Sequence, residues 1–232
     1  MHFPLTKFGL PQVAIYPLLV CALMAVLFVV FKPASWLFPA EAVLFLVFLW
    51  MLSFFRDPAR SVKIDEKVFL SPADGTITGV TLENDVPLGL DGLPVKALRI
   101  SMFLSIFNVH INRVPCSVRI EKVSYKKGQF KNAMSPDSSR INESNDVLML
   151  RLSEPKDRVL VRQVSGAIAR HIVCKAGEGA EYRQGEKFGM IKFGSRTELY
   201  LPAGEGSERY EVLVKEGDPV RAGITALVRY KP

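Results

Sequence analysis

Charged residues are almost absent from the first quarter of this sequence. Residues 8–55 contain only two charged side chains, Lys32 and Glu41, and apolar runs fill residues 11–31 and 35–55. A helix of that length reaches roughly 30 Å, the thickness of the hydrocarbon core of a bilayer. The lack of charge therefore predicts two apolar helices that associate with a membrane.

The link between the two runs is the short phrase "KPA", and Pro33 within it favours a break. We expect a helical hairpin over residues 1–56 that spans the membrane. A hairpin lying partly in the interface is an open alternative, because Pro39 and Glu41 interrupt the second run. A cleaved signal peptide fits poorly, since the first run is too long and no small-residue cleavage site precedes the second.

Positive charges return directly after the second run, as Arg56, Arg60 and Lys63, and Lys7 precedes the first run. By the positive-inside rule both ends of the hairpin lie in the cytoplasm. The second domain, residues 57–232, is then expected on the cytoplasmic side of the inner membrane, where a lipid can be its substrate.

The sequence also lacks the marks of two other protein classes. It has no recognisable nucleic-acid-binding module, so we assign its net charge of +7 to attraction by an anionic membrane surface. Its three cysteines, Cys21, Cys116 and Cys174, have no metal-ligand spacing, and no metal site is expected. They are interpreted as buried thiols in a reducing compartment.

Helical periodicity is scarce after Val68, where short runs of β-branched and aromatic residues alternate with polar ones. This pattern predicts a mainly β domain, an antiparallel barrel or sandwich. The phrases "YRQGEKFGMI" and "VKEGDPVRAGITAL" are similar to turns of lipoyl- and biotinyl-carrier domains, a weak sign of duplicated hammerhead-like units. Residues 104–110 and 135–146 are expected to be irregular. The polar segment 131–146 is either a mobile lid or an insertion without a role.

Histidine is scarce, which limits the search for acid–base groups. His2 is terminal and taken as idle, and His171 alternates with apolar neighbours as a structural residue would. His110 lies in "SIFNVHINRVPC" among several polar groups. It is either a hydrogen-bonded structural residue or a general acid and base, because both protonation states of histidine are available near neutral pH.

Asp74 and Ser195 are the other candidates, and each has an ordinary alternative. Asp74, in "SPADGTI", is either a turn residue before glycine or a carboxylate that orients a histidine. Ser195 follows Gly194 between two strand-like runs, where a simple turn would also fit. The sequence around Ser195 lacks the Gly-x-Ser-x-Gly elbow of the α/β-hydrolases.

Four phrases in order, "FFRDPAR", "SPADGTI", "FNVHINRVP" and "KFGSRTELYLP", resemble the phosphatidylserine decarboxylases in their short membrane-associated form. The resemblance covers the chain from about residue 50 to its end. It implies that the chain cleaves itself at Gly194-Ser195, giving a chain of residues 1–194 and a chain of residues 195–232. The two products are expected to stay together as a heterodimer.

The same resemblance implies how the cofactor arises. The oxygen of Ser195 attacks the carbonyl carbon of Gly194, an ester forms, and elimination followed by hydrolysis leaves a covalent pyruvoyl group on the shorter chain. This group serves as an electron sink for the decarboxylation of phosphatidylserine to phosphatidylethanolamine and carbon dioxide. No metal or dissociable cofactor is then required.

Residue by residue, the resemblance makes Ser195 the pyruvoyl precursor, Asp74 the aspartate of the processing triad and His110 the first of two histidines found in longer members. Arg113 stands where those members have the second histidine, and Arg196 stands where they have threonine. His110 alone is therefore expected to serve one or both reactions.

A different class of protein is the alternative: a membrane-anchored carrier or binding module similar to biotinyl or lipoyl domains. Such a module needs a modifiable lysine at a hairpin tip, and no convincing phrase of that kind is present. The sequence leaves the oligomeric state open, including a higher oligomer.

Overall fold

The computed structural model describes residues 5–32, 34–88, 94–135, 137–167, 171–192, 194–203 and 209–231. His2 and Pro33 lie outside these residues. The chain divides into two compact units, residues 1–59 and residues 60–232.

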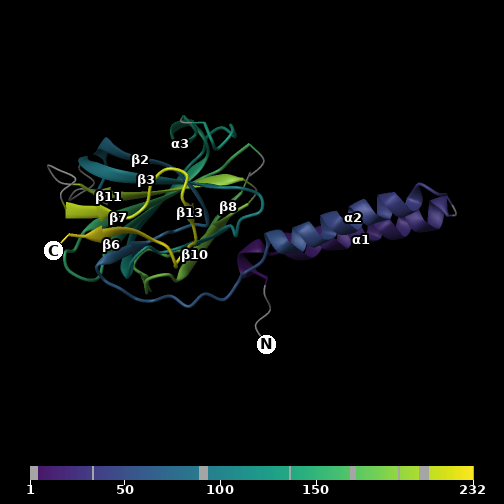
Figure 1. Ribbon diagram of the computed structural model, residues 1–232, viewed down its shortest axis with the longest axis horizontal. Helices are drawn as coiled ribbons and strands as arrows, with labels where there is room; N and C mark the ends of the chain where they lie inside the picture. The colour runs from purple at the N-terminus through teal and green to yellow at the C-terminus, as the bar shows by residue number, and fades with distance from the viewer. Residues whose placement is uncertain are drawn as a thin grey trace. The chain divides into compact units, whose positions relative to one another are not determined.

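The first unit is a pair of apolar helices, α1 (Gln12–Phe31) and α2 (Leu37–Phe54), preceded by the short 3-10 helix η1 (Lys7–Gly9) (Figure 1). Both helices are long and apolar enough to cross a membrane. Little of either helix is buried within the protein, in contrast to a core helix of a soluble domain. The expected pair of apolar helices is therefore confirmed.

The base of this hairpin is closed by backbone and aromatic contacts. The N–H of Thr6 donates to the carbonyl of Phe55 over 2.9 Å, and Leu5 bridges Arg56. The ring of Phe55 lies so close to Gly9 that a side chain there would collide with it. The chain entering α1 and the chain leaving α2 are thus held together.

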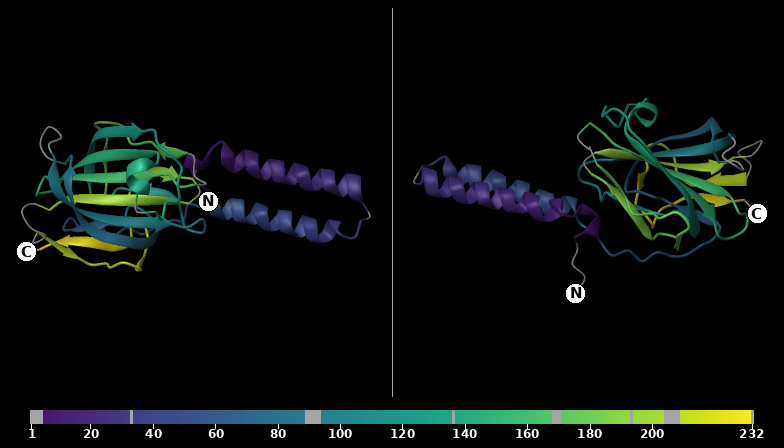
Figure 2. Two further views of the ribbon diagram at one scale, coloured as in Figure 1. Left: turned by 90° about the horizontal axis from the view of Figure 1, so that it is seen from above. Right: turned by 180° about the vertical axis from the view of Figure 1, so that it is seen from behind.

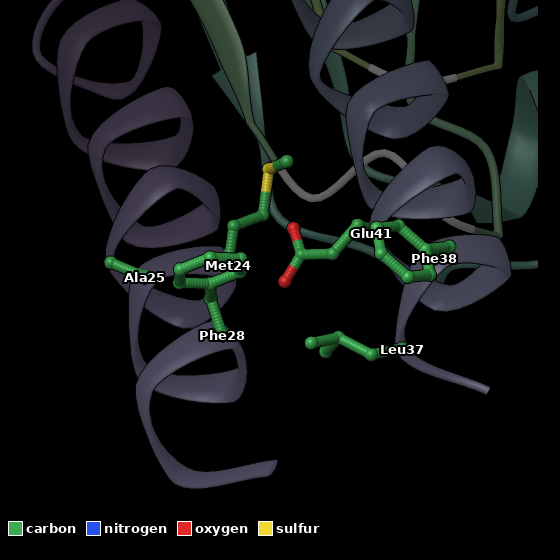
Figure 3. A pocket seen from close by; sticks show the side chains of 6 residues that line it. All are labelled: Met24, Ala25, Phe28, Leu37, Phe38 and Glu41. Carbon is green, nitrogen blue, oxygen red and sulfur yellow. The ribbon is translucent and has the colours of Figure 1, made fainter. Parts of the chain in front are cut away.

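Glu41 turns its carboxylate into the groove between the two helices (Figure 3). The groove has a volume of about 400 Å³ and is otherwise lined by apolar side chains, Met24, Ala25, Phe28, Leu37 and Phe38. One carboxylate oxygen, Oε1, is buried without a hydrogen-bond partner among the described residues. The one acidic residue of the hairpin therefore faces the neighbouring helix, where its charge is kept from the apolar outer surface.

The second unit is mainly β, and every strand pairing is antiparallel, as the alternation predicts. The sheets, with α3 (Ser138–Ile141) between β5 and β6 in the sequence, are drawn in Figures 1 and 2. The strands are β1 (Val68–Leu70), β2 (Gly75–Val86), β3 (Val95–Leu104), β4 (Ile111–Arg113), β5 (Val118–Lys126), β6 (Ser144–Arg151), β7 (Arg158–Val164), β8 (Ile172–Cys174), β9 (Glu181–Tyr182), β10 (Lys187–Ile191), β11 (Ser195–Pro202), β12 (Tyr210–Val212), β13 (Pro219–Val220) and β14 (Ala226–Tyr230).

Eight strands form one large sheet in the order β13-β2-β3-β11-β7-β6-β5-β9, and two three-stranded sheets have the orders β1-β14-β12 and β4-β10-β8. The large sheet ends at β13 and β9, so the described strands do not close into the barrel that was one of the two expected forms. The hammerhead-like units remain a prediction.

One apolar core joins the large sheet to both smaller sheets, through buried residues such as Met102, Phe188 and Val228. Strand β11 shows how the faces are divided. Leu199 and Leu201 belong to this core, whereas Tyr200 lies in a second cluster on the other face. By the same alternation Ser195 faces the side of the main core.

The polar segment 131–146 is partly regular over residues 135–146, which were expected to be irregular. It contains α3, and β6 already begins at Ser144. Ser139 donates to Glu198 of β11 over 2.5 Å, and Asn142 donates to the carbonyls of Lys131 and Ser165, both over 2.8 Å. The segment is thus anchored on the outer face of the large sheet, which argues against a disordered insertion.

Only one of the three cysteines matches the expectation of a buried thiol. Cys116 is buried, and burial raises the pKa of its thiol to about 12, so it is inert. Cys174 is half-buried, and Cys21 is exposed on α1. All three are free, and the described residues contain no group of side chains that could hold a metal ion.

Candidate active site

The ends of several strands meet at one end of the large sheet. Ser195, the first residue of β11, pairs with Leu104, the last residue of β3. On the other side of β3, Thr76 near the start of β2 pairs with Phe103. Asp74 directly precedes β2, so Asp74 and Ser195 flank the end of β3, about 10 Å apart at two strand spacings.

Ser195 is fully buried, and its Oγ has no hydrogen-bond partner among the described residues. Leaving a buried hydroxyl unpaired costs free energy, and such groups are uncommon outside functional sites. The hydroxyl is therefore held in place by the strand while its lone pairs stay available for reaction.

Gly194 precedes this serine in a left-handed backbone conformation, with φ of +62°. A Cβ at this position would find no atom nearer than Ile106 Cγ2 at 4.0 Å. Glycine is needed here because of its backbone conformation, since space for a side chain is available.

His110 is fully buried and directly precedes β4, which pairs with β10. Its carbonyl accepts from the N–H of Ile191, four residues before Ser195. Two residues before His110, Asn108 Oδ1 accepts from the N–H and Oγ of Ser105, both over 2.8 Å. Ser105 directly follows Leu104, the residue of β3 that pairs with Ser195. Two separate connections thus lead from the histidine segment to the serine.

The ring of His110 is oriented by a backbone group. Nδ1 lies 2.9 Å from the carbonyl oxygen of Asn108. A carbonyl can only accept, so Nδ1 carries the proton and Nε2 holds the lone pair of the neutral ring. Nε2 is then the nitrogen that can take a proton from a reacting group.

Asp74 is buried in a different set of contacts. Both of its carboxylate oxygens accept from Arg60, at 2.7 Å each, and Oδ1 also accepts from the N–H of Ala222 at 2.8 Å. Arg60 donates in addition to the carbonyl of Ala222. The carboxylate thus ties the start of the second unit to the loop after β13, and its part in a triad with His110 stays a prediction.

A network of buried amides, which the sequence did not indicate, lies beside Ser195. Asn112 Nδ2 donates to Thr197 Oγ1 over 3.0 Å, and Gln163 Nε2 donates to Asn112 Oδ1 over 2.9 Å. Asn145 Nδ2 extends the chain to Gln163 Oε1 over 3.0 Å. The network joins β4, β11, β7 and β6, and fixes the strand two residues beyond Ser195. In the sequence these residues look like ordinary polar members of alternating strands.

We expect Asn112→Ala to lower the free energy of unfolding by about 2–3 kcal/mol, because it leaves Thr197 and Gln163 without their buried partner. The melting temperature should fall by roughly 5–10 °C. The exposed Asn84 is the matched control, and Asn84→Ala should change the free energy of unfolding by less than about 0.5 kcal/mol. Equal melting temperatures for the two variants, measured by circular dichroism, would contradict this role of the network.

Arg196, the other unusual residue at this site, faces away from the serine. It is buried on the outer face of β11, with Nη1 3.7 Å from Oε1 of Glu198. Burial lowers the pKa of its guanidinium, while the Glu198 carboxylate opposes this shift. Glu198 in turn accepts from Tyr200 over 2.7 Å. Arg196 thus lies near the Glu198 carboxylate on the outer face of the strand, away from Ser195.

Lys192 is a further side chain that the sequence did not single out. It lies two residues before Gly194, and its N–H donates to the carbonyl of His171 over 3.2 Å. Lys192 is buried, and burial lowers the pKa of its amine. His171 itself is exposed.

A buried serine whose Oγ has no hydrogen-bond partner among the described residues, a glycine with positive φ before it, and a buried histidine with an oriented ring together fit a self-processing enzyme. Comparison with known proteins agrees: residues 47–228 match the phosphatidylserine decarboxylase family. Phosphatidylserine decarboxylase proenzymes from Carboxydothermus hydrogenoformans and Gluconacetobacter diazotrophicus are each 43% identical to this chain, over 82% and 85% of its length and 84% and 83% of theirs. That of Ruegeria pomeroyi is 38% identical, over 89% of this chain and 88% of its own.

The chain belongs to the phosphatidylserine decarboxylase family, as its four sequence phrases predict. It is a carboxy-lyase made as a proenzyme, and it depends on a pyruvoyl group. Because the chain belongs to this family, it is an enzyme, and the alternative of a carrier or binding module is rejected.

Proposed function

We propose that the proenzyme cuts itself between Gly194 and Ser195, and that Ser195 becomes the pyruvoyl group with which the enzyme decarboxylates phosphatidylserine. The observation that carries this proposal is the buried, unpartnered Oγ of Ser195, directly after a glycine with φ of +62°. The geometry suits the group, because the hydroxyl is buried at the start of β11 and the segment that carries His110 is hydrogen-bonded to residues on both sides of that point.

The two products, residues 1–194 and residues 195–232, would stay together because the shorter chain supplies strands to two sheets. β11 lies between β3 and β7 in the large sheet, and β14 lies between β1 and β12. Separation would remove β11 from the middle of the large sheet, would leave only β1 of the smaller sheet, and would expose Leu199, Leu201 and Val228. The fold must therefore form before the cut.

Each residue of the site has a separate role. Ser195 Oγ is the nucleophile of the cut, and Nε2 of His110 takes and returns protons during the cut, during decarboxylation, or in both. The pyruvoyl group supplies an electron sink for the carbon–carbon bond that breaks. Asp74 acts as the aspartate of the processing site, and Arg113, which replaces a second histidine, donates from Nη1 to the carbonyl of Gly185 over 2.8 Å.

The hairpin of residues 1–56 is proposed to span the inner membrane, with residues 57–232 on its cytoplasmic side. Arg56, Arg60 and Lys63 after α2, and Lys7 before α1, support this orientation. Phosphatidylserine would then reach the site from the cytoplasmic leaflet, and phosphatidylethanolamine would return to it.

The test is synthesis of the chain in a cell-free system with vesicles that contain phosphatidylserine. We expect the full-length chain to convert into two chains with time, and phosphatidylethanolamine to appear only after that conversion. Vesicles of phosphatidylcholine, which has no free amine, are the control and should give no product. Formation of phosphatidylethanolamine by the uncut chain would refute the proposed order of events.

Two variants distinguish a role of the Asp74 carboxylate in self-cleavage from its role in the ion pair with Arg60. Asp74→Asn and Arg60→Met both break the same buried pair, and each should lower the free energy of unfolding by about 3–5 kcal/mol. If the carboxylate serves the cut, Asp74→Asn should slow self-cleavage by about 100-fold or more, and Arg60→Met by less than about 10-fold. Gel analysis of conversion with time measures both rates, and equal slowing would assign Asp74 to the ion pair alone.

A further inference from the structure

Gly166 lies against the carbonyl group that the proposed cut would attack. It follows β7, whose last residue Val164 pairs with Arg196, so it reaches the same end of the sheet as Ser195. A Cβ placed on Gly166 would lie 2.1 Å from the carbonyl oxygen of Gly194 and 3.1 Å from its carbonyl carbon. Non-bonded carbon and oxygen atoms normally stay about 3.3 Å or more apart. Only glycine fits at residue 166 with the Gly194 carbonyl where it is.

The segment that carries Gly166 is firmly held. The N–H of Ser165 donates to the carbonyl of Glu143 over 2.9 Å, and Ser165 Oγ donates to the same carbonyl over 3.1 Å. The carbonyl of Ser165 accepts from Asn142 Nδ2 over 2.8 Å. These bonds keep the backbone beside Gly166 in place, so a side chain there would displace the Gly194 peptide.

We propose that Gly166 is a positioning residue for self-cleavage: its missing side chain leaves the space in which the Gly194 carbonyl oxygen sits while its carbon becomes tetrahedral. This inference rests on the proposed cut between Gly194 and Ser195. It concerns the acyl shift alone, because the cut leaves Gly194 as the carboxylate end of the longer chain, while the pyruvoyl group forms on the shorter chain.

The atoms of the reaction define the step at which Gly166 acts. Ser195 Oγ bonds to the carbonyl carbon of Gly194, the bond from that carbon to the Ser195 nitrogen breaks, and the hydroxyl proton ends on the nitrogen. Loss of the Ser195 α-proton then expels the Gly194 carboxylate. Water adds to the resulting enamine, after its tautomerisation, and ammonia leaves. Only the first of these steps makes the Gly194 carbonyl carbon tetrahedral, with negative charge on its oxygen.

The two glycines of the site therefore have different requirements. Gly194 needs its backbone conformation and has room for a Cβ, whereas Gly166 has no room and shows no positive φ. Gly79, in β2, has neither constraint, because nothing lies within 4 Å of a Cβ placed there. Gly79→Ala is thus a matched control for Gly166→Ala.

The test compares wild type, Gly166→Ala and Gly79→Ala in conversion of the full-length chain, followed by mass spectrometry. We expect Gly166→Ala to convert at least about 100-fold more slowly than wild type, as a displacement of about 1 Å of the reacting group would produce. Gly79→Ala should convert at the wild-type rate. Conversion of Gly166→Ala at the wild-type rate overturns the inference, while a wild type that is never cut at Gly194-Ser195 overturns the proposed function instead.

Hydroxylamine distinguishes the acyl shift from a general loss of structure, because it cleaves an ester and leaves a normal peptide bond intact. We expect no hydroxylamine-dependent cut at Gly194 in Gly166→Ala; an ester that accumulates there would show that the shift is intact and would overturn the inference. The double variant Gly166→Ala/Ser195→Ala should melt within about 10 °C of Ser195→Ala. A larger loss would assign Gly166 to folding and would also overturn the inference.

Discussion

Ser195→Ala is expected to leave the protein as one uncut chain of 232 residues without decarboxylase activity. Alanine has no oxygen to attack the Gly194 carbonyl, so no ester and no pyruvoyl group can form. Without this electron sink we expect activity to fall by at least about 10⁴-fold. Gel electrophoresis and the release of carbon dioxide from phosphatidylserine measure the two effects.

The fold should tolerate this change. Ser195 Oγ has no hydrogen-bond partner among the described residues, so its removal leaves no other group unsatisfied. We expect the melting temperature of Ser195→Ala to equal or exceed that of any other variant that stays uncut. Ser139→Ala is the control: it removes a second buried serine, which donates to Glu198 on the opposite face, and should lower stability while leaving cleavage intact. Normal activity in Ser195→Ala would rule out Ser195 as the cofactor precursor.

His110→Asn is expected to lower decarboxylation by about 10²- to 10⁴-fold, the usual contribution of a general acid or base. The amide of asparagine can replace Nδ1 as a donor to the carbonyl of Asn108, but it offers no basic nitrogen in place of Nε2. The loss would then come from proton transfer, with the local structure preserved. Both reactions are measured separately, conversion of the chain by gel and decarboxylation with chain that has already been cut.

His171→Asn is the control for the histidine, because that side chain is exposed. It should leave both reactions at the wild-type rate. Loss of decarboxylation in His110→Asn with normal cleavage would place His110 in the second reaction alone. Wild-type rates of both cleavage and decarboxylation in His110→Asn would show that His110 has no role at the site.

The hairpin could be predicted because it follows from local composition. Residues 8–55 hold only Lys32 and Glu41 as charges, and a long run without charge has few alternatives to a membrane helix. That Glu41 turns toward α1 could not be predicted, since it depends on how the two helices pack.

The strands could also be predicted from alternation, but their order in the sheets could not. β11 lies between β3 and β7, which precede it by many residues, and β13 pairs with β2. Such pairings depend on contacts between distant parts of the chain, which the period of a single strand does not encode. A barrel was therefore as compatible with the sequence as the open sheet.

The candidate site, too, could be predicted from the sequence only in part. Ser195, His110 and Asp74 could be proposed from residue type and resemblance, whereas their neighbours in the folded chain could not. Gly166 was not singled out in the sequence, and its approach to the Gly194 carbonyl exists only in the folded chain. The amide network of Asn112 and the anchoring of α3 on Glu198 are likewise non-local.

Intact mass spectrometry of the purified wild-type protein tests the central claim most directly. The account predicts two chains: residues 1–194 with an ordinary carboxylate, and residues 195–232 lighter by one ammonia than a peptide that begins with serine, as a pyruvoyl end requires. A single uncut chain, a cut at another bond, or a shorter chain with a free serine amine would contradict it.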